Sequence, residues 1–370
     1  MPEKDIQLLT SEMIAIPSLT TDQEACLKVL DYISSYLGKV HAETYLHTGV
    51  YSRIWGDNNT LMNPRLLLSG HIDVVDVEGD DTLFHSKEEA GKLYGRGAGD
   101  MKGHVASMLY SYKKWLEEGG PRGVGLLLTS DEEMGGFNGT RYVVEQGLKP
   151  KVVFIPDGTL DFSIVKSQKA PHHFVVEIQG QGGHAADSYK IKDPIDSLIA
   201  FYLRVQEKYD IATPENGWAS TFKMTVVNTP NQSKNKIPDR VTAAFSWRWP
   251  PEQILFEEGR DEITNLAKQY GVKILEEEGG GEGCILNENA EFVTQWKTII
   301  EEIIGRGVKF VNMHGTTDGR HFYNSKVAGT KNVLVTSAIS GDHHQKGEWV
   351  DIQSLNQLSG AISRYMRISE

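Results

Sequence analysis

The first half of the chain alternates short apolar runs with longer segments of helical periodicity. Nearly continuous apolar residues mark the segments 65–70 (RLLLSG), 124–130 (VGLLLTS) and 151–156 (KVVFIP). The segment after Gly103 instead places its apolar side chains on one helical face. Strands that are apolar on both faces are typical of a parallel sheet covered by helices on both sides. We therefore predict an α/β fold with a mainly parallel sheet and helices on both faces.

Residues 172–285 follow a different order, β-α-β-β-α-β, before the first alternation returns at 331–337 and 352–366. The strands and helices of this middle segment are expected, in chain order, at 172–179, 194–208, 220–227, 240–249, 253–270 and 272–278. Each of its helices has one apolar stripe, as expected if both cover one face of a four-stranded antiparallel sheet. We therefore predict an α/β domain formed by residues 1–171 and 286–370, with a ferredoxin-like α+β domain of residues 172–285 inserted into it.

The charge of the chain argues against two classes of partner. The 370 residues include 38 Lys and Arg against 50 Asp and Glu, a net charge of -12, whereas nucleic acids and anionic membranes require basic patches. The first residues carry acids where a signal peptide needs a basic start, and no segment approaches the roughly 20 apolar residues of a membrane-spanning helix. The two cysteines, Cys26 and Cys284, are too few for a disulfide framework. We expect a cytoplasmic protein with a small-molecule partner and neither a nucleic-acid nor a membrane partner.

Acids and histidines occupy loops that follow the predicted strands or precede a predicted helix. They are His71 and Asp73 in HIDVV, Asp100 in GRGAGDMKG, Asp131, Glu132 and Glu133 in TSDEEMGG, Asp157 in PDG, and His343 and His344 in GDHHQ. Open α/β sheets bind ligands at the carboxyl ends of their strands, and carboxylates and imidazoles are the ligands of hydrolytic metal ions. Taken singly, each residue has an ordinary alternative, such as a helix cap, a turn or a strand-end hydrogen bond. Taken together, they predict a two-metal site.

The motifs also resemble those of a known family. HIDVV, GRGAGDMKG, DEEMGG, the Asp of PDG, HGTTDGRHF and HQKGEWV span nearly the whole chain and resemble the dinuclear zinc amidohydrolase family. That family includes acetylornithine deacetylase, succinyl-diaminopimelate desuccinylase, aminoacylase and glutamate carboxypeptidase. The resemblance implies a zinc-peptidase-like catalytic domain, an inserted lid or dimerisation domain, and a homodimer formed through that domain. The first motif lacks the proline that often follows its valines, and Asp157 replaces the glutamate of many relatives, so the subfamily stays open.

The resemblance implies five metal ligands. His71 and Asp157 would complete the ligands of one ion, Glu133 and His344 would complete those of the other, and Asp100 would bridge both. His343 is the alternative to His344, which is preferred because it lies four residues before Glu348, as the family histidine does. The ions are expected to be zinc, with cobalt or manganese as alternatives.

The resemblance assigns two further carboxylates to the chemistry. Two divalent ions polarise an amide carbonyl and acidify a water molecule, and Glu132 would take the proton of that water and return it to the departing amine. Asp73 lies two residues from His71, so that both point to the same side of an extended chain, and Asp73 would orient the imidazole. We expect the remaining acid of the triplet, Asp131, to be a structural hydrogen-bond acceptor.

Four more residues would contact the substrate. His184 would reach the active site of a neighbouring subunit and stabilise negative charge that develops on the substrate. Arginine binds a carboxylate through two parallel hydrogen bonds, so the resemblance implies Arg320 and Arg248 as contacts for a substrate carboxylate and Asn235 as a lid residue. A surface salt bridge is the alternative for each arginine, and a plain surface loop is the alternative for His184.

We expect a metal-dependent hydrolase that cleaves the amide bond of an N-acyl amino acid or a related small compound. A dipeptidase or carboxypeptidase with the same two metals is the first alternative, and only a substrate panel separates it from a deacylase. A non-catalytic binding protein on the same fold is the second alternative. It is disfavoured because the chain keeps every expected ligand.

Overall fold

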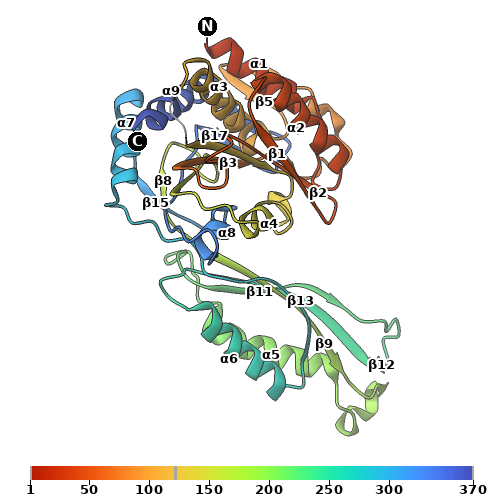
Figure 1. The fold of residues 1–370 in the computed structure, drawn as a ribbon. Coiled ribbons are helices and arrows are strands. Elements are labelled where there is room, and N and C mark those ends of the chain that lie inside the picture. The colour runs from red at the N-terminus through yellow and green to blue at the C-terminus, as the bar shows by residue number, and fades with distance from the viewer. Residues whose placement is uncertain (1, 121–122, 369–370) are drawn as a thin grey trace. The chain divides into compact units, whose positions relative to one another are not determined.

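The computed structural model describes residues 2–120 and 123–368, which form two compact units. The larger unit draws on both ends of the chain and includes the residues up to 166, residues 285–313 and those from 317 onwards. The smaller unit comprises residues 167–284 and 314–316, and Figure 1 shows it mainly in green and turquoise. Residues 1, 121–122 and 369–370 of the predicted α/β domain lie outside the described part of the chain.

The larger unit is built around a six-stranded sheet in the order β1-β2-β6-β3-β7-β16. The strands are β1 (Ala42–His47), β2 (Val50–Trp55), β3 (Leu66–His71), β6 (Val124–Thr129), β7 (Val152–Ile155) and β16 (Val333–Val335). Strands β6, β3, β7 and β16 are parallel to one another, whereas β1 and β2 form an antiparallel hairpin at one edge. The predicted mainly parallel sheet is therefore confirmed.

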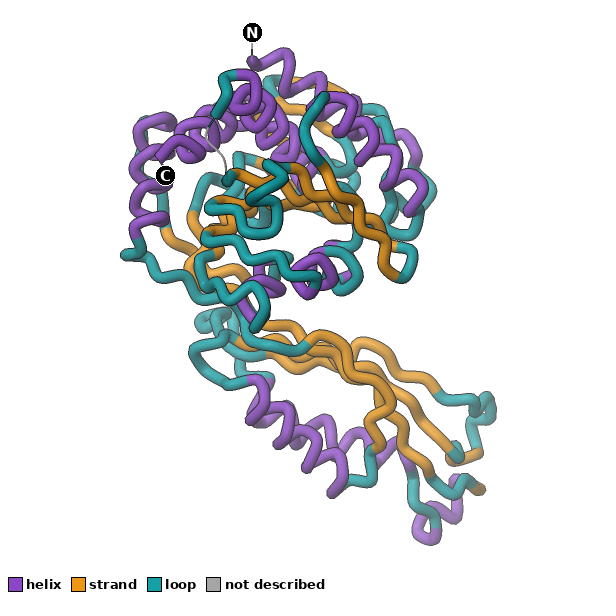
Figure 2. Tube along the Cα trace, in the orientation of Figure 1, coloured by secondary structure: helices purple, strands orange, loops and turns teal. Residues whose placement is uncertain are grey.

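Helices cover both faces of this sheet, as Figure 2 shows. One face is covered by α1 (Pro2–Ile14), α2 (Gln23–Leu37), α3 (Gly103–Glu117), α7 (Glu291–Ile304) and α9 (Ile352–Ile368), and the other by α4 (Thr140–Glu145) and α8 (Gly319–Asn324). Successive side chains of a strand point to opposite faces. Leu66 and Leu68 therefore join the core under the first set of helices, while Leu67 joins the core under the second. The unbroken apolar runs are needed because both faces are buried.

Strand pairing in two sheets of the larger unit brings together loops that are distant in the sequence. His71 at the end of β3 lies opposite Thr129 at the end of β6, and both strands are parallel, so the loops after them start side by side. A second sheet consists of β17 (Ser340–Gly341), β18 (Trp349–Asp351), β5 (Lys92–Tyr94) and β4 (Lys87–Glu89). Strand β18 pairs with both β17 and β5. The loop after β5, which carries Asp100, and the loop between β17 and β18, which carries His344, therefore start from adjacent strands.

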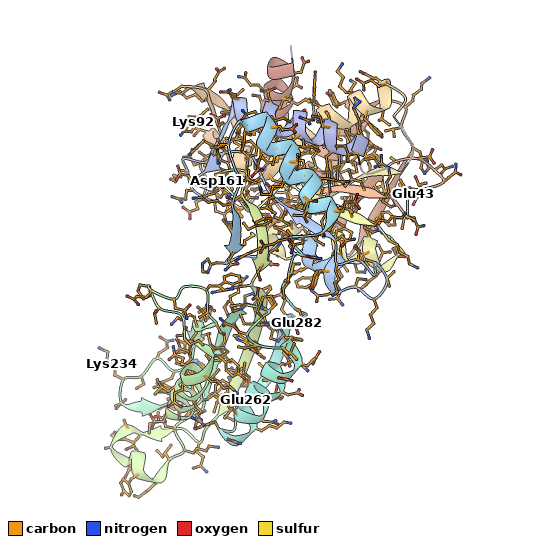
Figure 3. All side chains as sticks on the ribbon, turned by 90° about the vertical axis from the view of Figure 1, so that its left-hand side faces the viewer. Glu43, Lys92, Asp161, Lys234, Glu262 and Glu282 are labelled. Atoms are coloured by element: carbon orange, nitrogen blue, oxygen red, sulfur yellow. The ribbon has the colours of Figure 1, made fainter. Side chains whose placement is uncertain are left out.

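The smaller unit is an α+β domain with its own core. Its antiparallel sheet has the order β11-β13-β9-β14. Its elements, in chain order, are β9 (Ala170–Gln179), α5 (Pro194–Tyr209), β11 (Thr221–Asn228), β13 (Arg240–Trp249), α6 (Phe256–Gln269) and β14 (Lys273–Gly279). This chain order and the antiparallel sheet confirm the predicted ferredoxin-like order. Alternate residues of β13 are buried and pack with both helices. Figure 3 labels Glu262 on α6 and Lys234 in the loop after β11. None of the described helices combines the length and the apolar character that crossing a bilayer requires.

Candidate metal centre

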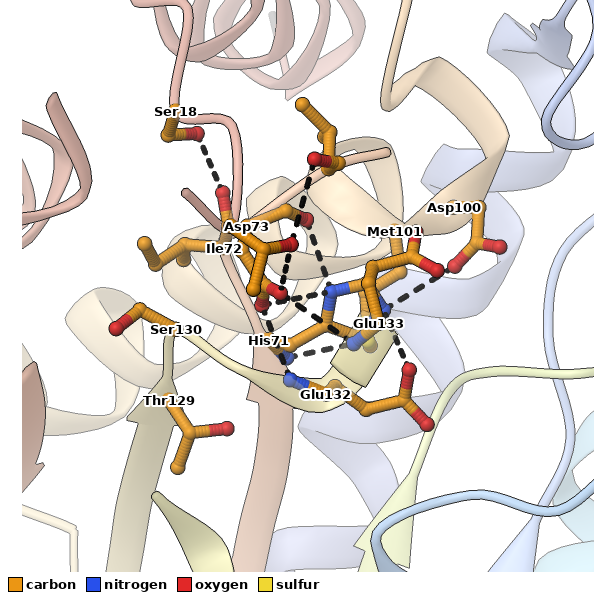
Figure 4. Close-up of polar contacts among 12 residues, drawn as sticks. Ser18, His71, Ile72, Asp73, Asp100, Met101, Thr129, Ser130, Glu132 and Glu133 are labelled. Atoms are coloured by element: carbon orange, nitrogen blue, oxygen red, sulfur yellow. Dashed lines mark hydrogen bonds and ion pairs between the residues drawn. The ribbon is translucent and has the colours of Figure 1, made fainter. Parts of the chain in front are cut away.

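His71 is held at the end of β3 with one ring nitrogen facing Asp100. The imidazole is buried, and its Nε2 lies 3.1 Å from Asp100 Oδ1. Its Nδ1 lies 3.0 Å from the carbonyl oxygen of Asp73 and 3.4 Å from the Asp73 carboxylate. Because Nδ1 can donate to these oxygens, loss of the proton on Nε2 would leave a lone pair that faces Asp100, as in a histidine that binds a metal ion. Figure 4 shows the imidazole between the two acids.

Asp100 joins two groups of potential ligands. One group consists of His71, Asp100 and Asp157. The other consists of Asp100, Glu133 and His344, and within each group the ligand atoms lie within 4.8 Å of one another. His344 Nε2 lies 3.0 Å from Asp100 Oδ2 and 3.1 Å from Glu133 Oε2. The structure therefore brings together all five residues that the sequence suggests as ligands.

The acids of this cluster repel one another in a buried setting. Burial, reinforced by the charge of Asp100, raises the pKa of Asp157 to about 6. Burial also raises the pKa of Glu133 to about 7, although the hydrogen bond from His344 opposes it. Hydrogen bonds to Asp100 and Glu133 raise the pKa of His344 to about 10. Burial lowers the pKa of His71, but hydrogen bonds to neighbouring carboxylates outweigh it and hold this pKa well above its usual value. Protons on the two histidines thus offset part of the negative charge.

The donor set fits two divalent cations. Imidazoles and carboxylates are the nitrogen and oxygen ligands that zinc, cobalt and manganese accept. Glu133 Oε1 is buried and has no hydrogen-bond partner within the described part of the chain, which is unusual for a buried carboxylate oxygen. A cation in each group would replace the protons that His71 and His344 hold. The unsatisfied oxygen and the mutual repulsion of the acids both favour cation binding.

Glu132 lies beside the cluster and belongs to neither group of ligands. Its Oε2 is 4.0 Å from His71 Nε2, and its backbone N–H donates to Asp73 Oδ1 at 3.4 Å. Burial raises the pKa of Glu132 well above its usual value, with the charge of His71 opposing this shift and neighbouring carboxylates adding to it. The side chain of Glu133 turns instead toward His344. The two adjacent glutamates therefore have different surroundings.

Asp73 ties together three segments beneath the cluster. Its side chain is completely buried. Its Oδ2 accepts the hydroxyl of Thr20 at 2.8 Å and the backbone N–H of Glu133 at 3.3 Å, while Oδ1 accepts the N–H of Glu132. Asp73 thus connects His71 with the acidic loop after β6. Thr20 is a positioning contact that no motif of the sequence marks.

Asp131 and Asp318 contact the acidic loop and hold its conformation. Asp131 Oδ2 accepts two backbone N–H groups, at 2.8 and 3.0 Å, so its expected role as a structural acceptor is confirmed. Asp318 accepts the hydroxyl of Thr140. Gly136 has φ 66° in this loop, and a Cβ there would lie 1.9 Å from Asp318 Oδ1, so only glycine fits. Asp318 is not among the predicted site residues, and its signal in the sequence is the motif HGTTDGRHF.

Arg320 borders the acidic loop within the larger unit. It lies on α8 and is 6% exposed. Its Nη2 donates to the carbonyl of Gly135 at 2.7 Å, and its guanidinium lies 5.1 Å from the centroid of the Phe137 ring. The guanidinium therefore contacts the segment that follows Glu133, through the Gly135 carbonyl and the Phe137 ring.

Both adjacent histidines approach Asp100, at different distances. His344 Nε2 lies 3.0 Å from Asp100 Oδ2, whereas His343 Nδ1 lies 3.9 Å from the same oxygen. His343 Nε2 is 2.9 Å from Ser340 Oγ. The geometry favours His344 as the ligand, because its Nε2 also reaches Glu133.

The remaining predicted site residues belong to the smaller unit. His184 and Asn235 lie close together there, since β10 (Gly183–His184) pairs with β12 (Lys236–Ile237) and the N–H of Ala185 donates to the Asn235 carbonyl at 2.9 Å. Both side chains are exposed. Arg248 lies near the carboxyl end of β13, whereas Asn235 precedes the start of that strand. Within this unit, the structure thus brings His184 and Asn235 together and places Arg248 apart from them.

The fold and the cluster define a class of protein. An α/β unit that gathers two overlapping groups of imidazole and carboxylate ligands beside its parallel strands is typical of a hydrolase with two metal ions. Residues 67–368 match the family described as peptidase family M20/M25/M40, and the chain belongs to this family. It is therefore a metal-dependent amidohydrolase.

Its relatives include both deacylases and peptidases. The succinyl-diaminopimelate desuccinylase of Rickettsia bellii is 26% identical over 373 residues, which cover 94% of this chain and 92% of that protein. A metallo-carboxypeptidase from Sulfolobus solfataricus has a similar structure, with a TM-score of 0.80 and 17% identity over 99% of each chain. A dinuclear metal-binding peptidase from Bacillus subtilis has a TM-score of 0.67 and 15% identity over 99% of this chain and 98% of that chain. The resemblance that the motifs carry and the predicted fold class are confirmed.

Proposed function

We propose that the chain is a dinuclear deacylase that cleaves the amide bond of an N-acyl amino acid or a similar small compound. The observation that carries the proposal is the pair of ligand groups that share Asp100. In the proposed centre His71 and Asp157 would bind one cation, and Glu133 and His344 would bind the other. Zinc is the proposed metal, and cobalt or manganese are alternatives that suit the same ligands.

The residues around the proposed centre divide the chemistry between them. When bound, two cations supply Lewis-acid polarisation of the amide carbonyl and acidify a water molecule. Glu132 takes the proton of this water on a carboxylate oxygen and returns it to the departing amine nitrogen. Burial raises the pKa of Glu132, which makes its carboxylate a stronger base than that of an exposed glutamate and favours uptake of the water proton. Asp73 fixes the backbone of Glu132 by accepting its N–H.

A substrate panel tests the proposed reaction. The chain should be assayed with added zinc or cobalt on N-succinyl and N-acetyl amino acids and on dipeptides. We expect at least one N-acyl amino acid to give a higher kcat/KM than every dipeptide. A dipeptide as the best substrate would favour the peptidase alternative. No turnover of any compound by protein that holds both metals would favour a binding protein.

We propose that Arg320 and Arg248 contact a carboxylate of the substrate, and Arg320→Lys tests the first of them. Lysine keeps the charge but loses the two parallel hydrogen bonds. A charge-assisted hydrogen bond contributes about 1.5–3 kcal/mol, so KM should rise roughly 10- to 100-fold with a smaller change in kcat. The same substrate with its carboxylate converted to an amide should show no such difference. An equal rise in KM for both compounds would make Arg320 a structural residue, and the same comparison on Arg248→Lys tests the second arginine.

We propose that residues 172–285 act as a lid and dimerisation domain, and that His184 with its neighbour Asn235 serves the active site of the partner chain in a homodimer. The exposure of both side chains supports this role. Chains with His184→Ala and chains with Glu132→Gln should each be nearly inactive alone. After mixing and exchange, about a quarter of wild-type activity should return, because half of the dimers are mixed and each has one intact site. Without any recovery, His184 does not act across subunits.

We also propose a cytoplasmic location. Cys26 and Cys284 are both buried, and two cysteines are too few for a disulfide framework, as is usual for proteins of reducing compartments. Cell fractionation should recover the native protein with cytoplasmic markers. Recovery from an oxidising compartment would contradict the proposal.

A further inference from the structure

We propose that a buried ion pair, Arg96 and Glu348, positions Asp100 and His344 and thereby sets the affinity of the centre for metal. The two side chains are 3% and 2% exposed, and Arg96 Nη1 lies 2.7 Å from Glu348 Oε2. Neither residue belongs to the proposed set of metal ligands. The inference rests on the proposed dinuclear centre and adds to it a pair of positioning residues.

Glu348 holds the loop that carries Asp100. Its Oε1 accepts the backbone N–H groups of Gly99 and Asp100, each at 3.0 Å. Its Oε2 is engaged by Arg96, so both oxygens of the buried carboxylate have partners. An apolar side chain at this position would leave two N–H donors without their acceptor in a buried setting. The backbone of Asp100, whose carboxylate joins both ligand groups, would then lose its fixed position.

Arg96 holds the loop that carries His344. Its Nη2 donates to the carbonyl of His344 at 3.3 Å, and its Nη1 donates to the carbonyl of Gln345 at 3.3 Å. His344 has φ 63°, in the left-handed region that residues other than glycine seldom adopt. Such a conformation persists where surrounding contacts hold it, and the guanidinium supplies two of these contacts. Arg96 therefore helps to aim the imidazole of His344 at Asp100 and Glu133.

Arg96 also reaches a third loop, and this explains why the pair is charged. Its Nη2 lies 3.4 Å from the carbonyl of Asp76, three residues after Asp73. A buried ion pair is seldom kept for stability alone, since apolar residues of similar volume often do as well. A guanidinium and a carboxylate, however, offer enough donors and acceptors to bind the backbone of several loops at once. Groups that support metal ligands in this way typically change metal affinity when they are removed.

Two variants of the chain test the inference, with Co²⁺ as the probe. Arg96→Met/Glu348→Met keeps the volume of the pair and removes its hydrogen bonds, whereas Glu348→Gln keeps one oxygen acceptor. Cobalt affinity and stoichiometry are measured by titration calorimetry, and ligand geometry is measured by the visible absorption of bound Co²⁺. We expect the double variant to lose roughly 10- to 100-fold in affinity for at least one ion and to change the spectrum. Glu348→Gln should lose less.

Arg53→Met is the matched control. Arg53 is buried in the same unit, and its Nη1 lies 2.9 Å from Asp31 Oδ1 and 3.0 Å from the carbonyl of Leu30. Its partners lie on α2 and on β1, where Thr44 accepts from its Nε, and not on either loop of the centre. We expect Arg53→Met to lower the Tm and to leave cobalt affinity and spectrum unchanged.

The outcomes separate the inference from the proposed function. Wild-type affinity and spectrum in both pair variants would overturn the inference, and so would an equal loss in Arg53→Met. If the double variant does not fold, Glu348→Gln and Arg96→Lys decide by the same measurements: weaker cobalt binding with an altered spectrum supports the inference, and unchanged binding overturns it. A wild-type chain that binds no cobalt would instead contradict the dinuclear centre itself.

Discussion

Glu132→Gln is expected to lower kcat about a thousandfold while both metal ions stay bound, since a positioned general base typically contributes 10²- to 10⁴-fold. Glutamine has nearly the same shape as glutamate but does not accept the proton of the attacking water. Glu132 belongs to neither ligand group, although it lies 4.0 Å from His71. Its loss should therefore affect the chemical step more than metal binding. Steady-state kinetics and elemental analysis on the same preparation measure both effects.

Asp131→Asn is the control for this experiment. It changes the neighbouring acid, whose carboxylate accepts backbone N–H groups of its own loop. An amide oxygen in the place of Oδ2 can still accept both of these bonds, so the loss of kcat should be much smaller than for Glu132→Gln. Wild-type turnover by Glu132→Gln with both metals bound would show that Glu132 is not the base. Loss of a metal ion from that variant would show that it is a ligand.

Removal of the metal ions is expected to lower the Tm of the chain by roughly 10 °C or more. A ligand at a thousand times its Kd stabilises the folded state by about 4 kcal/mol, and each kcal/mol shifts the Tm by about 2–4 °C for a unit of 150–250 residues. The physical cause is the cluster of buried acids around Asp100, whose repulsion the neighbouring histidines offset only in part when no cation is bound. Thermal unfolding with and without a chelator, followed by zinc repletion, measures the effect.

Asp100→Asn provides the control for the chelation experiment. The change removes the charge of the one residue that both ligand groups share. The variant should bind metal weakly and should show little difference in Tm between chelated and zinc-treated samples. An unchanged Tm on chelation of the wild-type chain, with metal loss verified, would mean that cations do not stabilise this cluster.

Much of this fold follows from local patterns of the sequence. The apolar runs that become β3, β6 and β7 bury both faces, and this burial requires helices on both sides of a parallel sheet. Acids and histidines that directly follow such strands can also be recognised in the sequence. They are expected to lie close together because parallel strands end at the same edge of the sheet. The structure brings these residues within a few ångströms of one another, as the spacing of the motifs suggests.

Other features have no local signal or only a weak one. Arg96 and Glu348 are 252 positions apart, and no periodicity marks two residues that meet only through the pairing of β5 with β18. The hairpin of β1 and β2 is absent from the predicted elements because β1 is largely exposed and lacks an apolar run. Its one clue in the sequence is Gly49, which follows Thr48. In the structure these two residues form the turn, and both have positive φ. Long-range contacts of this kind depend on the completed fold.

Elemental analysis of the purified chain, after zinc repletion and removal of excess metal, tests the dinuclear centre most directly. The two ligand groups that share Asp100 predict two zinc ions per chain, and a clear loss of zinc in Asp100→Asn. A wild-type chain without bound zinc, or one whose two ions are unaffected by Asp100→Asn, would contradict the centre described for this protein.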